Sequence, residues 1–441
     1  MIVNKQVTKM IKYYSTNKKS DKVSFKDAIL SGLAPDRGLY MPEKIVTFPE
    51  SVYNKTKFSD MCYEAAKLLV DGEMPDADLK SIVNDAFNFD VPVKKLHENI
   101  NILELFHGPT AAFKDFGARF MARVMSYFIR ENNEKITIVV ATSGDTGSAV
   151  AKGFYKVPNI DVVILYPKGK VSYLQEKQLT TLGENITALE VRGNFDDCQH
   201  MAKDAFMDNE LISKIKLSSA NSINIGRLFP QSFYYIWAFM QASKLRNQVI
   251  FCTPSGNFGN LTGGLLAKKM GLPVKKFIAA TNANDVVPEY LETGIFNPRP
   301  SVHTYSNAMD VGNPSNFARM LDLYNSQEEM SKDIIGYKVT DAETIEIIKE
   351  VYNNYNYVMD PHTAVGYKAI KDFLSNNPDD RNIPIILLST AHPAKFGDTI
   401  KDAIGKDIPV PSVLEEALQK EKRSIEIDNN FDNLKEYLLT R

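Results

Sequence analysis

The chain has 441 residues, and its 52 basic and 54 acidic side chains give a formal net charge of -2. This length predicts two or three domains, and the charge balance argues against a nucleic-acid groove or a basic membrane surface. Three cysteines without C-x-x-C spacing cannot form a disulfide framework, and six histidines without an H-E-x-x-H motif argue against a metal site. No apolar run reaches the ~20 residues of a membrane helix, and the reduced cysteines and polar N-terminus indicate the cytoplasm.

The first part of the chain is rich in loops and helices, and Gly32–Pro42 (GLAPDRGLYMP) is typical of turns. The first nine residues have the character of an added leader, to which we give no function. From about residue 100, short β-branched runs alternate with glycine-rich turns and helical stretches. The predicted strands are Ile136–Ala141, Val162–Leu165, Val249–Cys252, Phe277–Ala280 and Ile383–Leu388. This alternation predicts an α/β protein with parallel sheets, in which ligands bind at the carboxyl ends of the strands.

Lys114 stands out in the predicted helix over residues 113–130. Phe113, Phe116, Phe120 and Val124 share an apolar stripe, and the opposite polar arc runs from Asp115 through Arg119 and Arg123 to Ser126 and Arg130. Lys114 instead shares its side of the helix with Gly117, Ala118 and Met121. A lysine in this position either extends to solvent at the helix start or is desolvated, which lowers its pKa and frees the amine for catalysis.

Two glycine-rich loops follow predicted strands. One contains Ser143, Gly144, Asp145, Thr146 and Gly147, and the other runs from Pro254 to Asn260 (PSGNFGN). Each is compatible with an ordinary strand-to-helix turn or with a nest of donors that binds an anion. Neither matches a Walker A loop or G-x-G-x-x-G.

A third candidate anion site lies in Ser218–Arg227 (SSANSINIGR), where short polar side chains precede an arginine. The alternative is a turn and helix cap before a core helix predicted over residues 230–245, in which Trp237 serves packing.

These motifs together resemble the fold-type II pyridoxal-phosphate enzymes and, within them, the threonine synthase family. The resemblance covers nearly the whole chain, in the expected order. It rests on the segments HGPTAAFKDF at 107–116, SGDTG at 143–147, NSINIGR at 221–227, GNFGN at 256–260 and STAHP at 389–393. It implies two parallel-sheet subdomains, a mobile smaller one over about 100–225 and a larger one over 226–441. Together they form a catalytic region over 96–441, after a mainly helical N-terminal region over 10–95.

The resemblance also implies roles for individual residues. Lys114 would carry pyridoxal 5'-phosphate and exchange protons with the substrate. The remaining cofactor contacts would be Gly256, Asn257, Phe258 and Asn260 at the phosphate and Thr390 at the ring nitrogen. Ser143, Asp145, Thr146 and Gly147 would surround the substrate carboxylate, and Ser222, Asn224 and Arg227 would hold the substrate phosphate. An ionised Asp145 beside a carboxylate costs energy, so we expect Asp145 to serve the substrate amine or the loop itself.

The implied reaction is the conversion of O-phospho-L-homoserine and water to L-threonine and phosphate, the last step of threonine biosynthesis. A dehydratase or a phospho-lyase that releases a 2-oxo acid is an alternative on the same fold. A protein that only binds phosphorylated metabolites is an alternative from another class, although phosphate binding alone needs no lysine on an apolar helix face. The sequence leaves open whether the protein is a monomer or a dimer.

Overall fold

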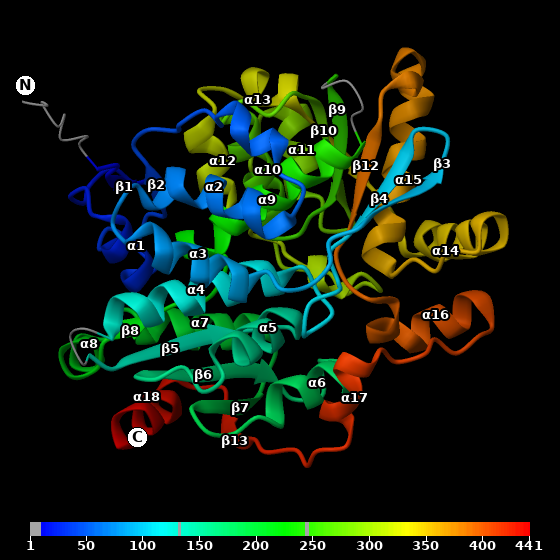
Figure 1. Ribbon diagram of the computed structural model, residues 1–441. Helices are drawn as coiled ribbons and strands as arrows, with labels where there is room; N and C mark the ends of the chain where they lie inside the picture. Colours follow the sequence, from blue (N-terminus) through cyan, green and yellow to red (C-terminus); the bar gives the residue numbers. More distant parts are fainter. Residues whose placement is uncertain (1–9, 131–133, 243–246) are drawn as a thin grey trace, which may run out of the picture.

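The structure is a computed structural model that describes residues 10–130, 134–242 and 247–441. It contains two separate parallel-type sheets with helices on both faces, and a mainly helical N-terminal region beside them (Figure 1). The predicted α/β class with these three parts is therefore confirmed. The suggested nine-residue leader lies outside the described residues.

The larger sheet has six strands in the order β11-β10-β9-β12-β4-β3, and each neighbouring pair is parallel except β3 and β4. Its strands are β3 (Val93–His97), β4 (Ile100–Glu104), β9 (Val249–Pro254), β10 (Val274–Thr281), β11 (Ile334–Lys338) and β12 (Ile385–Ser389). Every residue of β9 and β12 is buried, as expected for central strands covered on both faces.

The smaller sheet has five parallel strands in the order β13-β7-β6-β5-β8. They are β5 (Ile136–Ala141), β6 (Ile160–Pro167), β7 (Ile186–Arg192), β8 (Leu217–Ser218) and β13 (Ile425–Asp428). The five strands predicted from the sequence overlap β5, β6, β9, β10 and β12. The others lie at or toward the sheet edges and are shorter, more polar or both, so their apolar patterns are weaker.

Sheet membership differs from the predicted subdomain bounds at two places. β4 falls within the predicted smaller subdomain, yet it pairs with β12 in the larger sheet. β13 falls within the predicted larger subdomain, yet it pairs with β7 in the smaller sheet, so the chain crosses back near its C-terminus. Strand pairing is a long-range property that a linear division of the sequence does not capture.

The N-terminal region contains the antiparallel pair β1 (Tyr13–Ser15) and β2 (Tyr40–Pro42), the 3₁₀ turn Glu50–Asn54, and three helices. The helices are α1 (Phe25–Ser31), α2 (Phe58–Val70) and α3 (Asp76–Ala86). The Tyr13 and Phe25 rings both pack on Phe229, with centroids 5.9 and 6.2 Å away. The N-terminal region therefore shares one continuous hydrophobic core with the helices that lie between it and the sheets.

The remaining helices cover the faces of the two sheets. In chain order they are α4 (Lys114–Ile129), α5 (Asp145–Phe154), α6 (Tyr173–Thr180), α7 (Phe195–Ala205), α8 (Asn209–Lys214), α9 (Ile225–Ala242), α10 (Gly259–Lys269), α11 (Val286–Thr293), α12 (Phe317–Leu323), α13 (Gln327–Asp333), α14 (Asp341–Tyr355), α15 (Pro361–Asn376), α16 (Gly397–Ile404), α17 (Ser412–Leu418) and α18 (Phe431–Thr440). Short 3₁₀ turns occupy Asn307–Met309, Pro378–Asn382 and Pro393–Phe396. No described helix is long and apolar enough to cross a bilayer.

Two helices differ from the sequence prediction in ways that affect the site. Helix α9 begins at Ile225, five residues before the predicted start, so Pro230 lies inside it and Arg227 in its first turn. The end of the predicted helix, residues 243–245, lies outside the described residues. On α4, Asp115 and Arg119 of the predicted polar arc are buried. Asp115 accepts hydrogen bonds from Thr110, and Arg119 donates to the carbonyls of Asp85 and Ala86 at the end of α3, which is why a polar arc fits a buried helix.

Candidate active site

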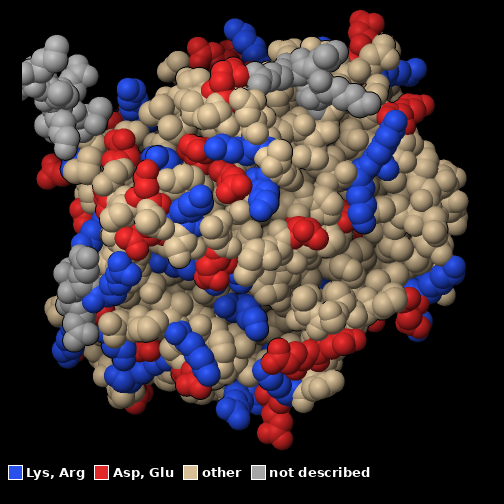
Figure 2. Space-filling model, in the orientation of Figure 1, with Lys and Arg blue, Asp and Glu red and all other residues tan. Residues whose placement is uncertain are grey.

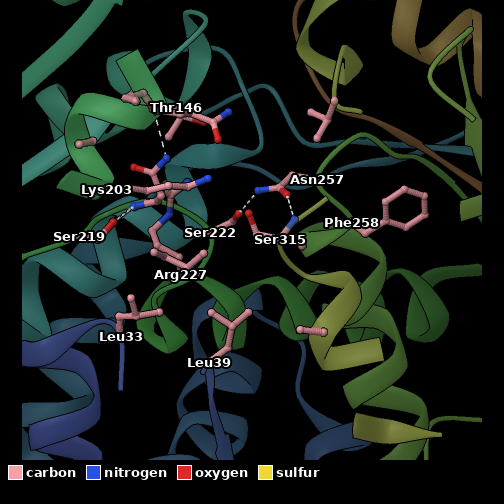
Figure 3. Close-up of a pocket in the computed structure, with 18 of the residues that line it drawn as sticks. Leu33, Leu39, Thr146, Lys203, Ser219, Ser222, Arg227, Asn257, Phe258 and Ser315 are labelled. Atoms are coloured by element: carbon pink, nitrogen blue, oxygen red, sulfur yellow. Dashed lines mark hydrogen bonds between the residues drawn. The ribbon is translucent and has the colours of Figure 1, made fainter. Parts of the chain in front are cut away.

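A cavity of about 1360 Å³ lies where the carboxyl ends of β5, β9 and β12 meet the start of α4. Its wall contains Ala141, Pro254 and Thr390 from the ends of these strands, and Lys114 from the helix. Parts of the N-terminal region close another side, including Leu33 and Leu39 (Figure 3). The cavity thus lies at the sheet edge where parallel α/β proteins bind ligands.

Lys114 is the first residue of α4 and is partly buried in the cavity wall. Burial lowers the pKa of its amine from the usual 10.5 to about 8, against the opposing effect of Asp145 and with smaller contributions from the cations of Arg227 and Lys395. Its Nζ makes no hydrogen bond with any described residue. A substantial fraction of the Lys114 amine is therefore neutral near pH 8, which is the state that a nucleophile or base requires.

The loop between β9 and α10 brings backbone and amide donors to the cavity. Phe258 adopts a left-handed conformation with φ 59°, and a Cβ atom on Gly256 would lie 2.6 Å from Met309 Cα. Asn260 is buried, and its Oδ1 accepts hydrogen bonds from the hydroxyls of Tyr234 and Tyr235 at 2.7 and 3.0 Å. These bonds fix the side-chain amide so that Nδ2, which has no partner in the protein, is left to donate to a ligand.

Arg227 is a second unsatisfied donor in the cavity wall. It is 3% exposed, its Nη1 donates to the Ala220 carbonyl, and its buried Nε has no hydrogen-bond partner. Burial lowers the pKa of the guanidinium to about 10, against the opposing effect of Asp115. Gly117 on α4 makes room for Arg227, because a Cβ there would lie 2.9 Å from the Arg227 Nε. A buried cation with a free donor is suited to bind an anion.

Ser222 and Asn257 lie side by side and are joined by a hydrogen bond (Figure 3). Asn257 Nδ2 donates to Ser222 Oγ at 2.7 Å, and Asn257 Oδ1 accepts from the Ser315 backbone at 2.6 Å. Asn224 differs from the prediction. Its side chain is fully buried outside the cavity wall, with Nδ2 donating to the carbonyls of Ile29 and Ser219 and Oδ1 accepting from Gly226. It therefore anchors the loop and has no donor left for a ligand.

The loop after β5 contains residues that line the cavity and residues that do not. Ser143 and Thr146 line the cavity, whereas Asp145 and Gly147 do not. The Gly147 amide donates to Thr142 Oγ1, and a Cβ on Gly147 would lie 2.5 Å from the Thr142 methyl group, so Gly147 serves packing. Asp145 thus lies outside the cavity wall, and its contacts are with other groups of the protein.

Asp145 instead forms a buried ion pair with Lys395, with Nζ 2.6 Å from Oδ1 and both side chains at most 3% exposed. Gln175 Nε2 also donates to Asp145 Oδ1 at 2.9 Å, and Lys395 Nζ donates to the Thr110 carbonyl at 3.0 Å. Burial by itself would raise the pKa of Asp145, but the cations of Lys395 and Lys114 hold it well below its usual range. The pair joins the start of α5 on the smaller sheet to the turn after β12 on the larger one.

Sequence reasoning missed Lys395, although it lies two residues after the STAHP motif. A lone lysine in a short turn carries no signal of burial. It also missed His362, which lines the cavity, donates from Nδ1 to the buried Asp360 at 2.7 Å and accepts at Nε2 from the Ala308 amide. Because Nε2 accepts a backbone hydrogen, this histidine is the neutral tautomer protonated at Nδ1. A D-P-H sequence at a helix start gives no such indication beyond capping.

Thr390 connects two motifs of the predicted site. It is 6% exposed and lines the cavity, and its carbonyl accepts a hydrogen bond from the Phe113 amide, one residue before Lys114. The His392 amide likewise donates to the Ala111 carbonyl at 3.0 Å. Backbone pairing therefore sets the Thr390 hydroxyl close to the start of α4. No group of histidine, cysteine and acidic side chains suited to a metal occurs among the described residues.

These features fit pyridoxal phosphate. The cavity combines a lysine of lowered pKa, an orphan amide donor at Asn260, a loop that leaves no room for a side chain at Gly256, and a hydroxyl at Thr390. Arg227 is a further buried cation in the wall of the same cavity.

Three family profiles match the chain. Pyridoxal-phosphate dependent enzyme matches residues 89–388, threonine synthase N terminus matches residues 12–87, and threonine synthase C-terminal matches residues 363–438. The first profile covers more than half of the chain, and the three together cover most of it.

Full-length relatives agree with these profiles. The chain is 45% identical over 430 residues to a threonine synthase of Haemophilus influenzae, covering 97% of this chain and 99% of that protein. Its structure is similar to the crystal structure of threonine synthase from Escherichia coli, with a TM-score of 0.91 and 41% identity over 97% of this chain and 99% of the other. It is also similar to the structure of PLP-bound threonine synthase from Brucella melitensis, with a TM-score of 0.90 and 35% identity over 97% and 98% of the two chains.

Proposed function

Because the chain belongs to the threonine synthase family of pyridoxal-phosphate-dependent lyases, we propose that it converts O-phospho-L-homoserine and water to L-threonine and phosphate. The observation that carries this proposal is the pair of unsatisfied buried donors, Asn260 Nδ2 and Arg227 Nε, in the cavity that Lys114 enters. The reaction needs one site for the phosphate of the cofactor and another for the phosphate of the substrate.

The cofactor would be held by Lys114 and by the loop after β9. Asn260 Nδ2 and the backbone amides around Gly256, Asn257 and Phe258 are the donors for its phosphate, at the start of α10. Thr390 offers a hydroxyl to the ring nitrogen. When bound, pyridoxal phosphate supplies an electron sink for negative charge that develops on the substrate.

The substrate would lie between the two loops on either side of Lys114. Ser143 and Thr146 line the wall nearest the start of α5, where hydroxyls and backbone amides suit the substrate carboxylate. Ser222 and Arg227 offer a hydroxyl and a guanidinium to the substrate phosphate. Asp145, Gly147 and Asn224 shape these loops from behind.

Lys114 is the base that this cavity offers for proton transfer. Its neutral amine removes the Cα proton and then one Cβ proton, while Arg227 and Ser222 hold the phosphate that leaves from Cγ. A proton is delivered to Cγ, which becomes the methyl group of threonine. Water then adds its hydroxyl at Cβ, and a proton returned to Cα completes the product. The lowered pKa of Lys114 places both its protonated and its neutral form within reach near neutral pH, as acid–base exchange requires.

The test is product analysis with the purified holoenzyme and O-phospho-L-homoserine. We expect threonine and phosphate in equal amounts, and no turnover by Lys114→Ala with the fold intact by circular dichroism. Borohydride reduction and peptide mapping should place the cofactor on Lys114. A 2-oxo acid as the main product would assign the chain to the alternative lyase chemistry, and label on another lysine would refute the role of Lys114.

We also propose that the protein acts in the cytoplasm without a nucleic-acid partner, as a monomer or a dimer. The three cysteines are buried and free, which suits a reducing compartment. Basic and acidic side chains are interspersed over the face in Figure 2, where no extended basic surface is seen.

A further inference from the structure

Ser222 has an unusual set of hydrogen bonds. Its Oγ accepts from Asn257 Nδ2 at 2.7 Å and from Asn316 Nδ2 at 3.0 Å. A serine hydroxyl has two acceptor lone pairs and one hydrogen to donate. Two amide donors therefore occupy both lone pairs, and the hydroxyl hydrogen donates to no described residue.

The orientation of both amides is fixed by groups that can only donate. Asn257 Oδ1 accepts from the Ser315 backbone N–H at 2.6 Å, so its nitrogen must face Ser222. Asn316 Oδ1 accepts from Arg319 Nη1 at 2.7 Å, so its nitrogen must also face Ser222. The roles of donor and acceptor in this group follow from chemistry, since neither a backbone N–H nor a guanidinium can accept.

Arg319 supports the same loop from behind. It is fully buried and donates to the carbonyls of Ser222, Ile223 and Tyr40 at 3.0, 2.6 and 3.3 Å. Burial lowers the pKa of its guanidinium to about 9, against the opposing effect of Asp322, yet it forms no ion pair with a described carboxylate. Burying a cation without a paired anion is costly. Because no anion neutralises it, the Arg319 guanidinium keeps its positive potential beside the proposed substrate-phosphate site.

We propose that Asn316 is a positioning residue that, together with Asn257 and under the control of Arg319, aims the Ser222 hydroxyl hydrogen at the phosphate of the substrate. The proposal rests on the proposed function and deepens it. It makes Ser222 an obligate donor, and it links the loop that holds the cofactor phosphate to the loop that holds the substrate phosphate through one oxygen atom.

Asn316→Asp tests this arrangement with almost no change in shape. The new carboxylate keeps the bond to Arg319 and gives that cation a partner, which offsets the lost bond to the Asn257 carbonyl, so the thermal midpoint should change little. Its other oxygen can only accept, so it takes the Ser222 hydrogen away from the ligand. Asn316 Nδ2 also donates to the Asn257 carbonyl of the cofactor loop at 3.2 Å, and the variant loses this bond. Retention of pyridoxal phosphate is therefore measured alongside, and it should fall less than the affinity for phosphate.

The measurement is the affinity of the holoenzyme for inorganic phosphate, by calorimetry, in a double-mutant cycle with Ser222→Ala. Asn316→Asp should weaken phosphate binding in both backgrounds. If Ser222 donates a charge-assisted hydrogen bond to phosphate, the loss of affinity should be about tenfold larger with Ser222 present than in the Ser222→Ala background. Asn313→Asp is the control for added charge, because Asn313 lines the cavity without a hydrogen bond to Ser222. Its effect should be the same in both backgrounds.

Equal factors for Asn316→Asp in the two backgrounds would overturn the proposal, since the added charge alone would then explain the loss. In turnover, the same variant should raise KM more strongly than it lowers kcat. If the cycle shows coupling between Asn316 and Ser222 but the unmutated holoenzyme makes no threonine, the proposed function is refuted and this inference stands. If the unmutated holoenzyme makes threonine and the cycle shows no coupling, only the inference is refuted.

Discussion

Replacing Lys114 by methionine should stabilise the cofactor-free protein at neutral pH. Folding lowers the pKa of the Lys114 amine from 10.5 to about 8, so the unfolded chain binds more protons at this group between these two values. Stability therefore rises with pH across this window, and the full cost of the charged amine is present below pH 8. That cost is at most about 3.4 kcal/mol, and access of solvent to the cavity reduces it.

The free-energy cost of the charged Lys114 amine can be isolated by comparing the stabilities of the parent and Lys114→Met at each pH. Methionine adds a packing contribution that does not depend on pH, whereas the lysine cost does. The stability advantage of Lys114→Met over the parent should therefore shrink by about 2 kcal/mol between pH 7 and pH 9.5. Urea unfolding of both cofactor-free proteins, with identical buffers and protein concentrations, gives this difference and cancels the titration of other groups.

Labelling with trace acetic anhydride provides an independent measure of the same pKa. Acetylation of Lys114 in the cofactor-free parent should follow a titration with its midpoint near pH 8, while the exposed Lys19 serves as the internal control. A stability difference that stays constant with pH, together with a midpoint near 10.5, would refute the argument that burial lowers the pKa of Lys114.

Four other residue positions give sharp expectations. Asn260→Ala should weaken retention of pyridoxal phosphate, whereas Arg227→Ala should keep the cofactor and lose at least about tenfold in substrate affinity. Cofactor absorbance and KM separate these effects, and equal effects on both ligands would contradict two distinct anion sites. Asp145→Asn should destabilise the protein by about 3–5 kcal/mol by leaving Lys395 buried without an anion, as judged by urea unfolding. A loss below about 1 kcal/mol would show that the pair is hydrated. Thr390→Asp should shift the cofactor spectrum and the ratio of threonine to side products, and spectra identical to the parent for both Thr390→Asp and Thr390→Val would exclude contact with the ring nitrogen.

The sequence could predict those parts of the fold whose signal is local. The central strands have continuous apolar runs, and the loops after β5 and β9 contain glycines where the chain turns into a helix. Lys114 was recognisable because a single lysine interrupts an apolar helix surface. Each of these signals lies within a window of about ten residues.

The remainder depends on contacts between distant segments. Lys395 is far from Asp145 in sequence, and neither residue indicates its partner. Arg319 lies on the short helix α12 and Asn316 immediately precedes it, and no motif marks either residue, although both support the Ser222 loop. Asn224 illustrates the opposite error, since a polar residue inside a recognised motif proved to hold the end of α1 through the Ile29 carbonyl.

The late return of the chain to the smaller sheet has a consequence for biosynthesis. Strand β7 pairs with β13, which leaves the ribosome long after β7 has been made. During translation, the outer edge of β7 therefore presents unpaired backbone groups to the crowded cell until β13 has been synthesised. One edge of β4 likewise stays unpaired until β12 has been synthesised. Chaperone demand during synthesis should thus fall only when β13 has emerged, and a chain that stalls before β13 is the form most exposed to aggregation.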